Sequence, residues 1–261
     1  MLETIILGLI QGLTEWLPIS STGHLKLAER LLGLEVPILF DVALHMGTLV
    51  VILLFFRKDI INVLRALGHL DFKTENGKLI PLIIVGTVPT ALIGLVFGDN
   101  IETAFRNVLP IAIAFMICGI ALYSSRIGKE QEDNISYVEA LAIGTAQGIA
   151  IIPGISRSGM TIAIALIMGI KREKAFRFSF LLSIPAVIGA FGLTLHTQYG
   201  ELATAGLDWI EIIAGIVIAT IAGYIGLKLL WKILAVKKFF VFAFYCWVLG
   251  AVLIALSLSG F

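Results

Sequence analysis

The sequence predicts an all-α polytopic membrane protein with six transmembrane helices and two re-entrant helix hairpins. Apolar side chains make up 59% of the 261 residues and charged side chains only 14%, an apolar share above and a charged share below those of a typical soluble domain. Six segments carry the roughly 20 mostly apolar residues that a helix needs to cross a bilayer. They are residues 36–56, 79–98, 108–126, 177–197, 210–231 and 239–260.

Two further apolar stretches, residues 2–34 and 138–170, are interrupted by polar turns near Pro18 and Pro153. The helix that follows the second turn has only about 13 residues and rises about 20 Å, whereas the hydrocarbon core is about 30 Å thick. Broken helices are tolerated at membrane depth only where protein or a water-filled cavity shields them. We therefore expect two re-entrant hairpins that line a cavity.

The two hairpins also resemble each other in sequence, at a constant offset of 136 residues. Gly8, Gln11, Gly12, Ile19, Ser20, Gly23 and Gly33 match Gly144, Gln147, Gly148, Ile155, Ser156, Gly159 and Gly169. We interpret the chain as a single membrane domain, residues 1–261, made of two repeats. Repeat one covers about 1–126 and repeat two about 138–261.

The loop charges predict how the repeats are oriented. Of the 19 Lys and Arg residues, 15 fall in loops on one side of the predicted spans, Lys26, Arg30 and Arg106 fall on the other, and Arg157 lies in the second polar turn. Because Lys and Arg collect on the cytoplasmic side, the first group marks that side. Three spans separate the hairpins, so one hairpin enters from outside and the other from inside. This is an inverted-topology repeat, whose broken elements meet near the midplane to form a binding site.

Several classes of protein are excluded. The net charge is +1 and there is no basic tract, which argues against a nucleic-acid partner. Cys118 and Cys246 lie in apolar runs without a His or a second Cys at ligand spacing, so neither a zinc site nor a disulfide framework is predicted. The first segment carries Glu3, Gln11 and Glu15, which a cleavable signal peptide would not.

The first polar turn and the helix before it carry an acid and two kinds of reactive group. Gln11 and Glu15 are four residues apart and therefore share one helical face. A buried ionisable side chain in a membrane segment indicates function unless a structural salt bridge explains it. Ser21 and His24, in the same turn, supply a hydroxyl and a proton carrier. Taken singly, such residues are more often interhelical hydrogen-bonding groups or satisfied core residues.

The second polar turn carries Arg157, which has no acidic neighbour in its own hairpin. Its planar guanidinium suits a phosphate, because it binds two phosphate oxygens at once. The surrounding small residues would allow backbone N–H groups to approach the same anion, as would the start of the following helix. The alternative is that Arg157 pairs only with Glu15 and serves packing.

The strings EWLPISSTGH and PGISRSGMT resemble the two signature regions of the undecaprenyl-diphosphate phosphatase family known as BacA or UppP. The resemblance extends over essentially the whole chain. It implies a plasma-membrane phosphatase that converts polyprenyl diphosphate to the monophosphate and so recycles the lipid carrier of cell-surface glycan assembly. It also implies reaction at the outer face, a divalent cation, and an acidic pair of which Glu15 is the second member. Here Gln11 replaces the first acid of the pair, so a metal site has one carboxylate fewer.

From the resemblance and the residue types we expect a defined set of site residues. The expected catalytic residues are Glu15, Ser21, His24 and Arg157, and the expected substrate-binding residues are Gln11, Ser20, Thr22, Ser156, Ser158 and Thr161. Mg²⁺ or Ca²⁺ would be held by Glu15 with Gln11. The nucleophile is open between Ser21, which we favour, His24 and water.

Further expectations concern the rest of the pocket and the partners. Asp41 and His45 form a candidate lining pair, for which structural packing is an equal alternative. The lipid tail is expected along helix faces near residues 86–98 and 184–192. A homo-oligomer is compatible with the sequence. The rival function is a transporter or flippase of polyprenyl phosphate, since inverted repeats with broken helices are typical of alternating-access carriers.

Overall fold

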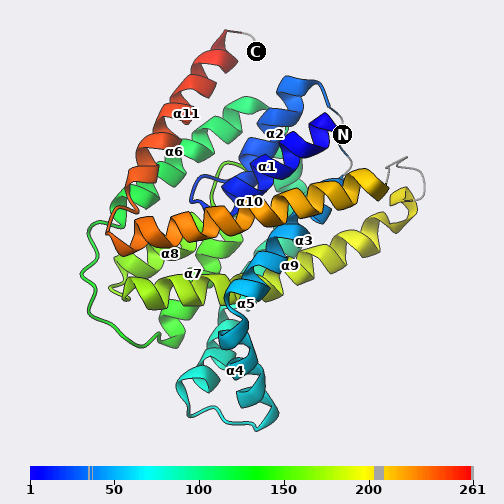
Figure 1. Cartoon of the computed structure of the whole chain (residues 1–261). Helices are drawn as coiled ribbons and strands as arrows, with labels where there is room; N and C mark the ends of the chain where they lie inside the picture. The colour runs from blue at the N-terminus through cyan, green and yellow to red at the C-terminus, as the bar shows by residue number, and fades with distance from the viewer. Residues whose placement is uncertain (35, 37, 203–208, 260–261) are drawn as a thin grey trace.

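The computed structural model describes the chain except for residues 35, 37, 203–208 and 260–261. The described residues fold into α-helices (Figure 1), with a single isolated β-bridge, Glu132 to Ile170. The helices are α1 (Leu2–Trp16), α2 (Ser21–Leu32), α3 (Ile38–Phe55), α4 (Arg57–Gly68), α5 (Glu75–Ala104), α6 (Val108–Ser124), α7 (Tyr137–Ile149), α8 (Arg157–Ile167), α9 (Arg172–Leu202), α10 (Trp209–Ala235) and α11 (Val241–Leu258). The prediction of an all-α protein is confirmed.

Four helices are long and apolar enough to cross a membrane, namely α5, α9, α10 and α11. They coincide with four of the six predicted spans. The predicted span 36–56 forms α3, which together with α4 counts as a fifth crossing if the pair, bent by 78°, is taken as one span. The predicted span 108–126 forms α6, an apolar helix of 17 residues. The described residues therefore hold four to five candidate spans by length and composition.

The two predicted hairpins are the pairs α1–α2 and α7–α8. In the first, α1 ends at Trp16 and Leu17 has an extended backbone, with φ −66° and ψ 144°. The residue before a proline is pushed out of the helical region, so Pro18 fixes this end. The second helix of each hairpin begins with a serine cap, Ser20 for α2 and Ser156 for α8. A serine oxygen at this position satisfies one of the otherwise unpaired N–H groups of the first turn.

Each hairpin packs its first helix closely on a long helix from the other half of the chain. Helix α1 contacts α10, and α7 contacts α5. A Cβ atom added to Gly12 would lie 2.6 Å from the Ala219 carbonyl oxygen, and one added to Gly144 would lie 2.0 Å from that of Gly86. Glycine at these positions allows the backbones to approach, as is typical of helix pairs in membranes.

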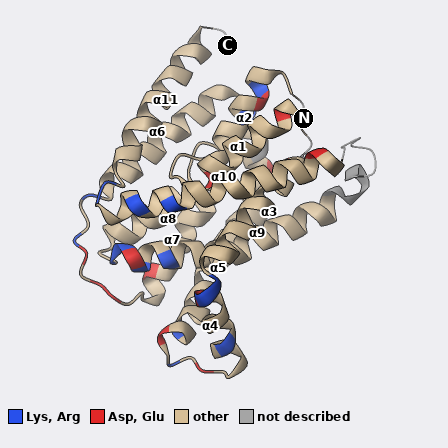
Figure 2. Ribbon diagram, in the orientation of Figure 1, with Lys and Arg blue, Asp and Glu red and all other residues tan. Residues whose placement is uncertain are grey.

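Lys and Arg gather on one end of the molecule. Figure 2 shows them around α4, the start of α9 and the end of α10, whereas few are drawn near the two chain ends on the opposite side. Ion pairs tie this charged end together, including Arg177 with Asp59 at 2.7 Å and with Glu75 at 3.0 Å. The polar turns of both hairpins are buried instead, since Ser20 is 4% and Ser156 2% exposed.

Candidate functional site

The polar turns of both hairpins open onto one cavity of about 580 Å³. Its polar lining includes Glu15, Ser20, Ser21, Thr22, His45, Thr87, Thr90, Gln147, Ser156, Arg157 and Thr194. Its apolar wall comes from α5 and α9, through Ala91, Gly94, Leu95, Pro185, Ala186, Val187, Gly189, Ala190 and Leu193. A pocket of this size, mostly apolar with a few convergent polar groups, has the character of a ligand site.

The carboxylate of Glu15 lies at the polar end of the cavity and joins the two hairpins. The Glu15 side chain is only 6% exposed and is ion-paired with the Arg157 guanidinium of the second hairpin. The Ser21 hydroxyl donates a hydrogen bond to Glu15 Oε2, and Gln11 Nε2 donates to the same oxygen at 3.1 Å. A buried carboxylate costs several kcal/mol unless it is paired and hydrogen-bonded. These partners explain how Glu15 remains charged here.

The guanidinium of Arg157 is placed to bind an anion as well as Glu15. It lines the cavity, its side chain is 18% exposed, and its Cζ lies 5.5 Å from the centre of the Trp16 ring. Among the described residues, its guanidinium donates a hydrogen bond only to Glu15. Arginine has five N–H donors. The others therefore remain available to phosphate oxygens in the cavity.

The serine caps connect the hairpins to each other. Ser20 Oγ accepts hydrogen bonds from Gly23 N at 3.3 Å and from Gly154 N of the other hairpin at 3.0 Å. In return, Ser158 Oγ donates to the Trp16 carbonyl at 2.9 Å. The first turns of α2 and α8 consequently begin beside the cavity, at Ser21 and Arg157. Helix N-termini carry partial positive charge, so both favour an anion there.

Comparison with known proteins identifies the family. A family model described as "Bacitracin resistance protein BacA" matches residues 4–252. The chain belongs to the BacA family. Relatives named undecaprenyl-diphosphatase come from Carboxydothermus hydrogenoformans, 43% identical over 99% of this chain and 98% of that protein, and from Methanosphaera stadtmanae, 44% identical over 98% of each. Undecaprenyl-diphosphatase 4 of Bacillus thuringiensis is 40% identical over 98% of this chain and 97% of its own. With its apolar helices, this BacA-family chain is a multi-pass membrane protein.

His24 is turned away from the cavity in this BacA-family chain. Its Nδ1 lies 2.7 Å from the Ser20 carbonyl and its Nε2 lies 2.7 Å from the Tyr245 hydroxyl on α11. Its ring stacks on Tyr245 and meets Phe115 edge to face. A carbonyl only accepts, so Nδ1 carries the proton and Nε2 accepts from the tyrosine. His24 therefore holds the first turn against α11 and has no free nitrogen near Ser21.

The histidine that lies beside Glu15 in the cavity is His45, and not His24 as the sequence suggested. It lines the cavity, and its Nε2 is 3.5 Å from Glu15 Oε2. Its Nδ1 lies 2.8 Å from the Asp41 carbonyl, so Nδ1 is the donor and Nε2 faces the carboxylate. The side chain of Asp41 is not part of the cavity lining.

Of the six predicted substrate-binding residues, three line the cavity and three lie behind its lining. Ser20, Thr22 and Ser156 line the cavity. Gln11 instead contacts Glu15, and Thr161 Oγ1 donates to the Arg157 carbonyl at 2.9 Å. With Ser158, these two residues lie behind the lining and hold it in place.

Sequence reasoning missed the contribution of Gln147 and of the threonines on α5. Gln147 is 2% exposed, lines the cavity and donates from Nε2 toward Thr90 Oγ1 at 3.3 Å. Its Oε1 atom is buried and has no hydrogen-bond partner. The signal was present, because Gln147 matches Gln11 at the constant offset of 136 residues. The threonines gave no signal, because Ser and Thr are common in membrane helices.

A divalent cation fits this site only with oxygens supplied by substrate. Within the described part of the chain, no cluster of three or more His, Cys, Asp or Glu side chains could hold a metal. Gln11 Oε1, however, is buried without a hydrogen-bond partner beside the single carboxylate of Glu15. Mg²⁺ is often bound by one or two carboxylates together with substrate phosphates. Glu15 would supply the carboxylate of such a site, and the amide of Gln11 would have to turn toward the cavity to add its oxygen.

Proposed function

We propose that this chain hydrolyses undecaprenyl diphosphate to undecaprenyl phosphate and inorganic phosphate. The observation that carries the proposal is the meeting of Glu15, Ser21 and Arg157 at the polar end of a cavity with an apolar wall. The names of the relatives agree with it, since each is an undecaprenyl-diphosphatase. Such an enzyme regenerates the lipid carrier of cell-surface glycan assembly, which the family resemblance had led us to expect.

Substrate binding would use both ends of the cavity. The diphosphate lies against the guanidinium of Arg157 and the first turns of α2 and α8, with Ser20, Thr22 and Ser156 as hydrogen-bonding groups. The isoprenoid tail follows the apolar wall of α5 and α9, which includes Gly94 and Ala186. This is where the sequence had placed it. Phosphoryl transfer depends mainly on positioning and electrostatics, so the guanidinium of Arg157 and the two helix N-termini suit this reaction.

In the proposed reaction, Ser21 is the nucleophile and Glu15 its base. Ser21 Oγ, already hydrogen-bonded to the carboxylate, attacks the terminal phosphorus as its proton passes to Glu15. The bond from that phosphorus to the bridging oxygen breaks, and the lipid monophosphate leaves with the electron pair. Glu15 gives this proton to the departing lipid monophosphate. Water then attacks the phosphoserine and its proton passes to Glu15, which returns it to Ser21 Oγ as phosphate leaves. Arg157 neutralises charge on the transferred group.

His24 has a positioning role in this proposal, because its two ring nitrogens are both engaged away from the cavity. A divalent cation, Mg²⁺ or Ca²⁺, would be held by Glu15 and Gln11 and would neutralise negative charge on the diphosphate. His45 lies on the same side of Glu15, with its Nε2 3.5 Å from Glu15 Oε2. The protein residues nevertheless perform every proton transfer in the scheme.

We also propose that the chain is an inverted-topology repeat with six spans and two re-entrant hairpins, and that its site opens to the outer face. The reciprocal packing of α1 on α10 and of α7 on α5 supports the repeat. Twofold-related repeats produce such exchanged contacts. The concentration of Lys and Arg at one end supports a cytoplasmic placement of that end.

The test is phosphate release by the purified full-length chain from undecaprenyl diphosphate, in detergent with Mg²⁺ or Ca²⁺. Ser21→Ala is expected to lower kcat by about 10³-fold or more and to abolish a trapped phosphoserine. Glu15→Gln keeps the size of the side chain, removes the base, and is expected to cost roughly 10²- to 10⁴-fold.

A matched control is Ser183→Ala, because Ser183 is buried, bonds to the Phe180 carbonyl and lies outside the cavity lining. It should retain activity. Tight binding of the lipid without phosphate release, across a series of cations, would contradict the proposal and favour a carrier. A phospho-enzyme located on His24 would contradict the assignment of Ser21.

A further inference from the structure

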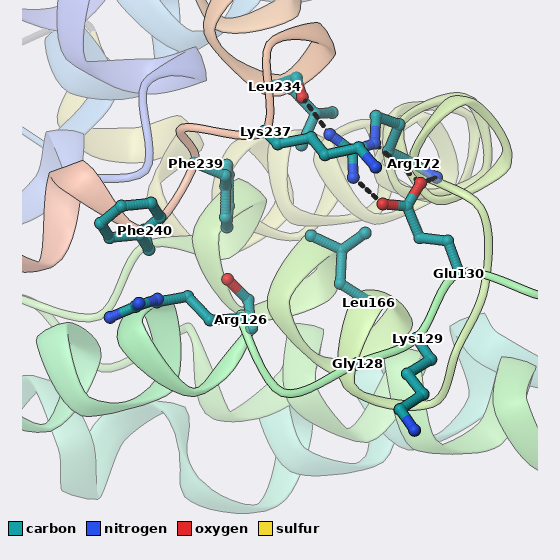
Figure 3. A pocket seen from close by; sticks show the side chains of 11 residues that line it. Arg126, Gly128, Lys129, Glu130, Leu166, Arg172, Leu234, Lys237, Phe239 and Phe240 are labelled. Atoms are coloured by element: carbon teal, nitrogen blue, oxygen red, sulfur yellow. Dashed lines mark hydrogen bonds and ion pairs between the residues drawn. The ribbon is translucent and has the colours of Figure 1, made fainter.

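A second cavity, of about 400 Å³, lies at the positively charged end of the molecule, away from the candidate active site. Figure 3 shows its walls, which come from the segment after α6, the end of α8, the start of α9 and the end of α10. Three candidate spans begin or end here, at Arg172, Ala235 and Val241. The cavity therefore lies at the level where lipid headgroups meet the protein.

The charge of this basic pocket is strongly unbalanced. Its lining holds four cationic side chains, Arg126, Lys129, Arg172 and Lys237, and one carboxylate, Glu130. Glu130 is already used by Arg172, whose Nε donates to it at 2.7 Å. Among the described residues, Lys129 and Lys237 have no acidic partner within ion-pair distance. The excess of three positive charges is therefore not neutralised by the protein's carboxylates.

Helix dipoles account for only part of this excess. Three helices, α6, α8 and α10, end beside the pocket, and each C-terminus carries roughly half a negative charge. Together they offset about half of the positive excess. A net positive charge therefore remains around this concave site.

Two local features prepare the pocket for a phosphate. The guanidinium of Arg126 lies over the Phe240 ring, with its Cζ 4.7 Å from the ring centre, and over the Tyr123 ring at 4.8 Å. Lys237 has a φ of 63°, in the left-handed region where the residue after a helix is usually glycine. A side chain there costs about 1 kcal/mol or more relative to glycine. This cost is understandable if the ammonium group has a role.

We propose that this basic pocket binds a phosphate-bearing anion, foremost the headgroup of an anionic membrane phospholipid. Its cations would hold the phosphate, while Leu166, Phe239 and Phe240 offer an apolar surface to the glycerol and the start of the acyl chains. Basic pockets between helices at this face of a membrane are suited to such headgroups. A soluble phosphate compound could supply the same anionic group to these cations. The inference does not depend on the proposed hydrolysis.

The test measures lipid binding to the full-length protein in detergent by native mass spectrometry. The probes are dioleoyl phosphatidylglycerol, dioleoyl phosphatidylcholine and inorganic phosphate. Wild type should bind phosphatidylglycerol about tenfold or more tightly than phosphatidylcholine, and Lys129→Gln/Lys237→Gln should lose that preference. The matched control is Lys58→Gln/Lys78→Gln, which removes two exposed lysines of the same charged end outside the pocket. It should keep the preference.

Three results would overturn the assignment of a lipid headgroup to the pocket: an unchanged preference in Lys129→Gln/Lys237→Gln, an equal loss in the control, or no preference in wild type. Inorganic phosphate also reaches the active-site cavity, so only the part of its binding that the pocket variant loses is assigned to the pocket. Such a loss for phosphate, with none for phosphatidylglycerol, identifies a soluble anion as the ligand. Phosphate release from undecaprenyl diphosphate by the pocket variant shows that it is folded and separates this test from that of the proposed function.

Discussion

The two hairpins share a backbone plan and differ in the chemistry that they carry. Both have a serine cap at the start of the second helix, Ser20 and Ser156, and a glycine three residues later. The residue directly after the serine cap is Ser21 in the first hairpin and Arg157 in the second. The residue that matches Glu15 in the second hairpin is Ile151. One hairpin thus brings the acid and the hydroxyl, and the other brings the cation. The shared plan positions the two turns, and the differences at single positions supply the chemistry of the site.

Replacing Arg157 of the second hairpin by lysine, which keeps the positive charge, should have the largest effect on activity. Arg157→Lys keeps a positive charge but loses the planar fork that can bind Glu15 and phosphate together. We expect phosphate release to fall by roughly 10²- to 10³-fold. Steady-state kinetics on undecaprenyl diphosphate will measure it. If Arg157 served only to neutralise Glu15, the lysine variant would retain most of its activity.

The close helix contacts of the two hairpins should differ in their tolerance of a methyl group. Gly144→Ala brings Cβ to 2.0 Å from the Gly86 carbonyl oxygen, whereas Gly12→Ala brings it to 2.6 Å from that of Ala219. We expect both variants to be destabilised by about 1–3 kcal/mol, Gly144→Ala more than Gly12→Ala. Thermal unfolding in detergent ranks them. Gly98→Ala, with open space around it, is the control and should not lose stability.

The two serine caps should respond differently because their backbones differ. Ser20 has a φ of 65° and accepts two N–H groups, whereas Ser156 has a φ of −83° and accepts one from Gly159. We expect Ser156→Ala to cost about 1 kcal/mol and Ser20→Ala more. Ser20→Gly should cost less than Ser20→Ala, because glycine tolerates positive φ. The same order at Ser156 would argue that backbone strain is not the cause.

The smallest effect should come from the tyrosine that holds His24. Tyr245→Phe removes the hydroxyl that lies 2.7 Å from His24 Nε2 and should cost about 1 kcal/mol of stability. We expect kcat to change by less than about threefold, because His24 does not face Ser21. A much larger change in kcat with unchanged stability would give His24 a direct part in proton transfer.

The sequence predicted the helical class, the two helix pairs and the meeting of Glu15 with Arg157. Each of these follows from a short stretch of sequence whose burial in a membrane would be unfavourable by itself. A broken apolar helix, a buried acid and an unpaired guanidinium each need a partner or a shield. Four of the six predicted spans are confirmed as helices long and apolar enough to cross a membrane, and the other two stay predictions. Residues 36–56 and 108–126 are apolar, but the sharp bend between α3 and α4 and the 17-residue length of α6 depend on packing that composition does not record.

The roles of the histidines could not be predicted from spacing. His24 is three residues from Ser21, which suggested a catalytic pair, yet its partner is Tyr245, 221 residues away. His45 reaches Glu15 from α3, and the sequence singled it out only as a candidate lining residue. Side-chain direction in a helical bundle is set by neighbours distant in the chain, so single-sequence reasoning places such residues near the site but does not orient them.

The ion pair between Glu15 and Arg157 joins residues 142 positions apart, which has a consequence for biosynthesis. At roughly 5–20 residues per second, a ribosome needs on the order of ten seconds to reach the arginine after making the glutamate. During that interval the carboxylate has no guanidinium, and α10, on which α1 packs, has not yet emerged. The first hairpin must therefore wait at the membrane surface or inside the insertion machinery, and the nascent chain holds no assembled active site until its second half arrives.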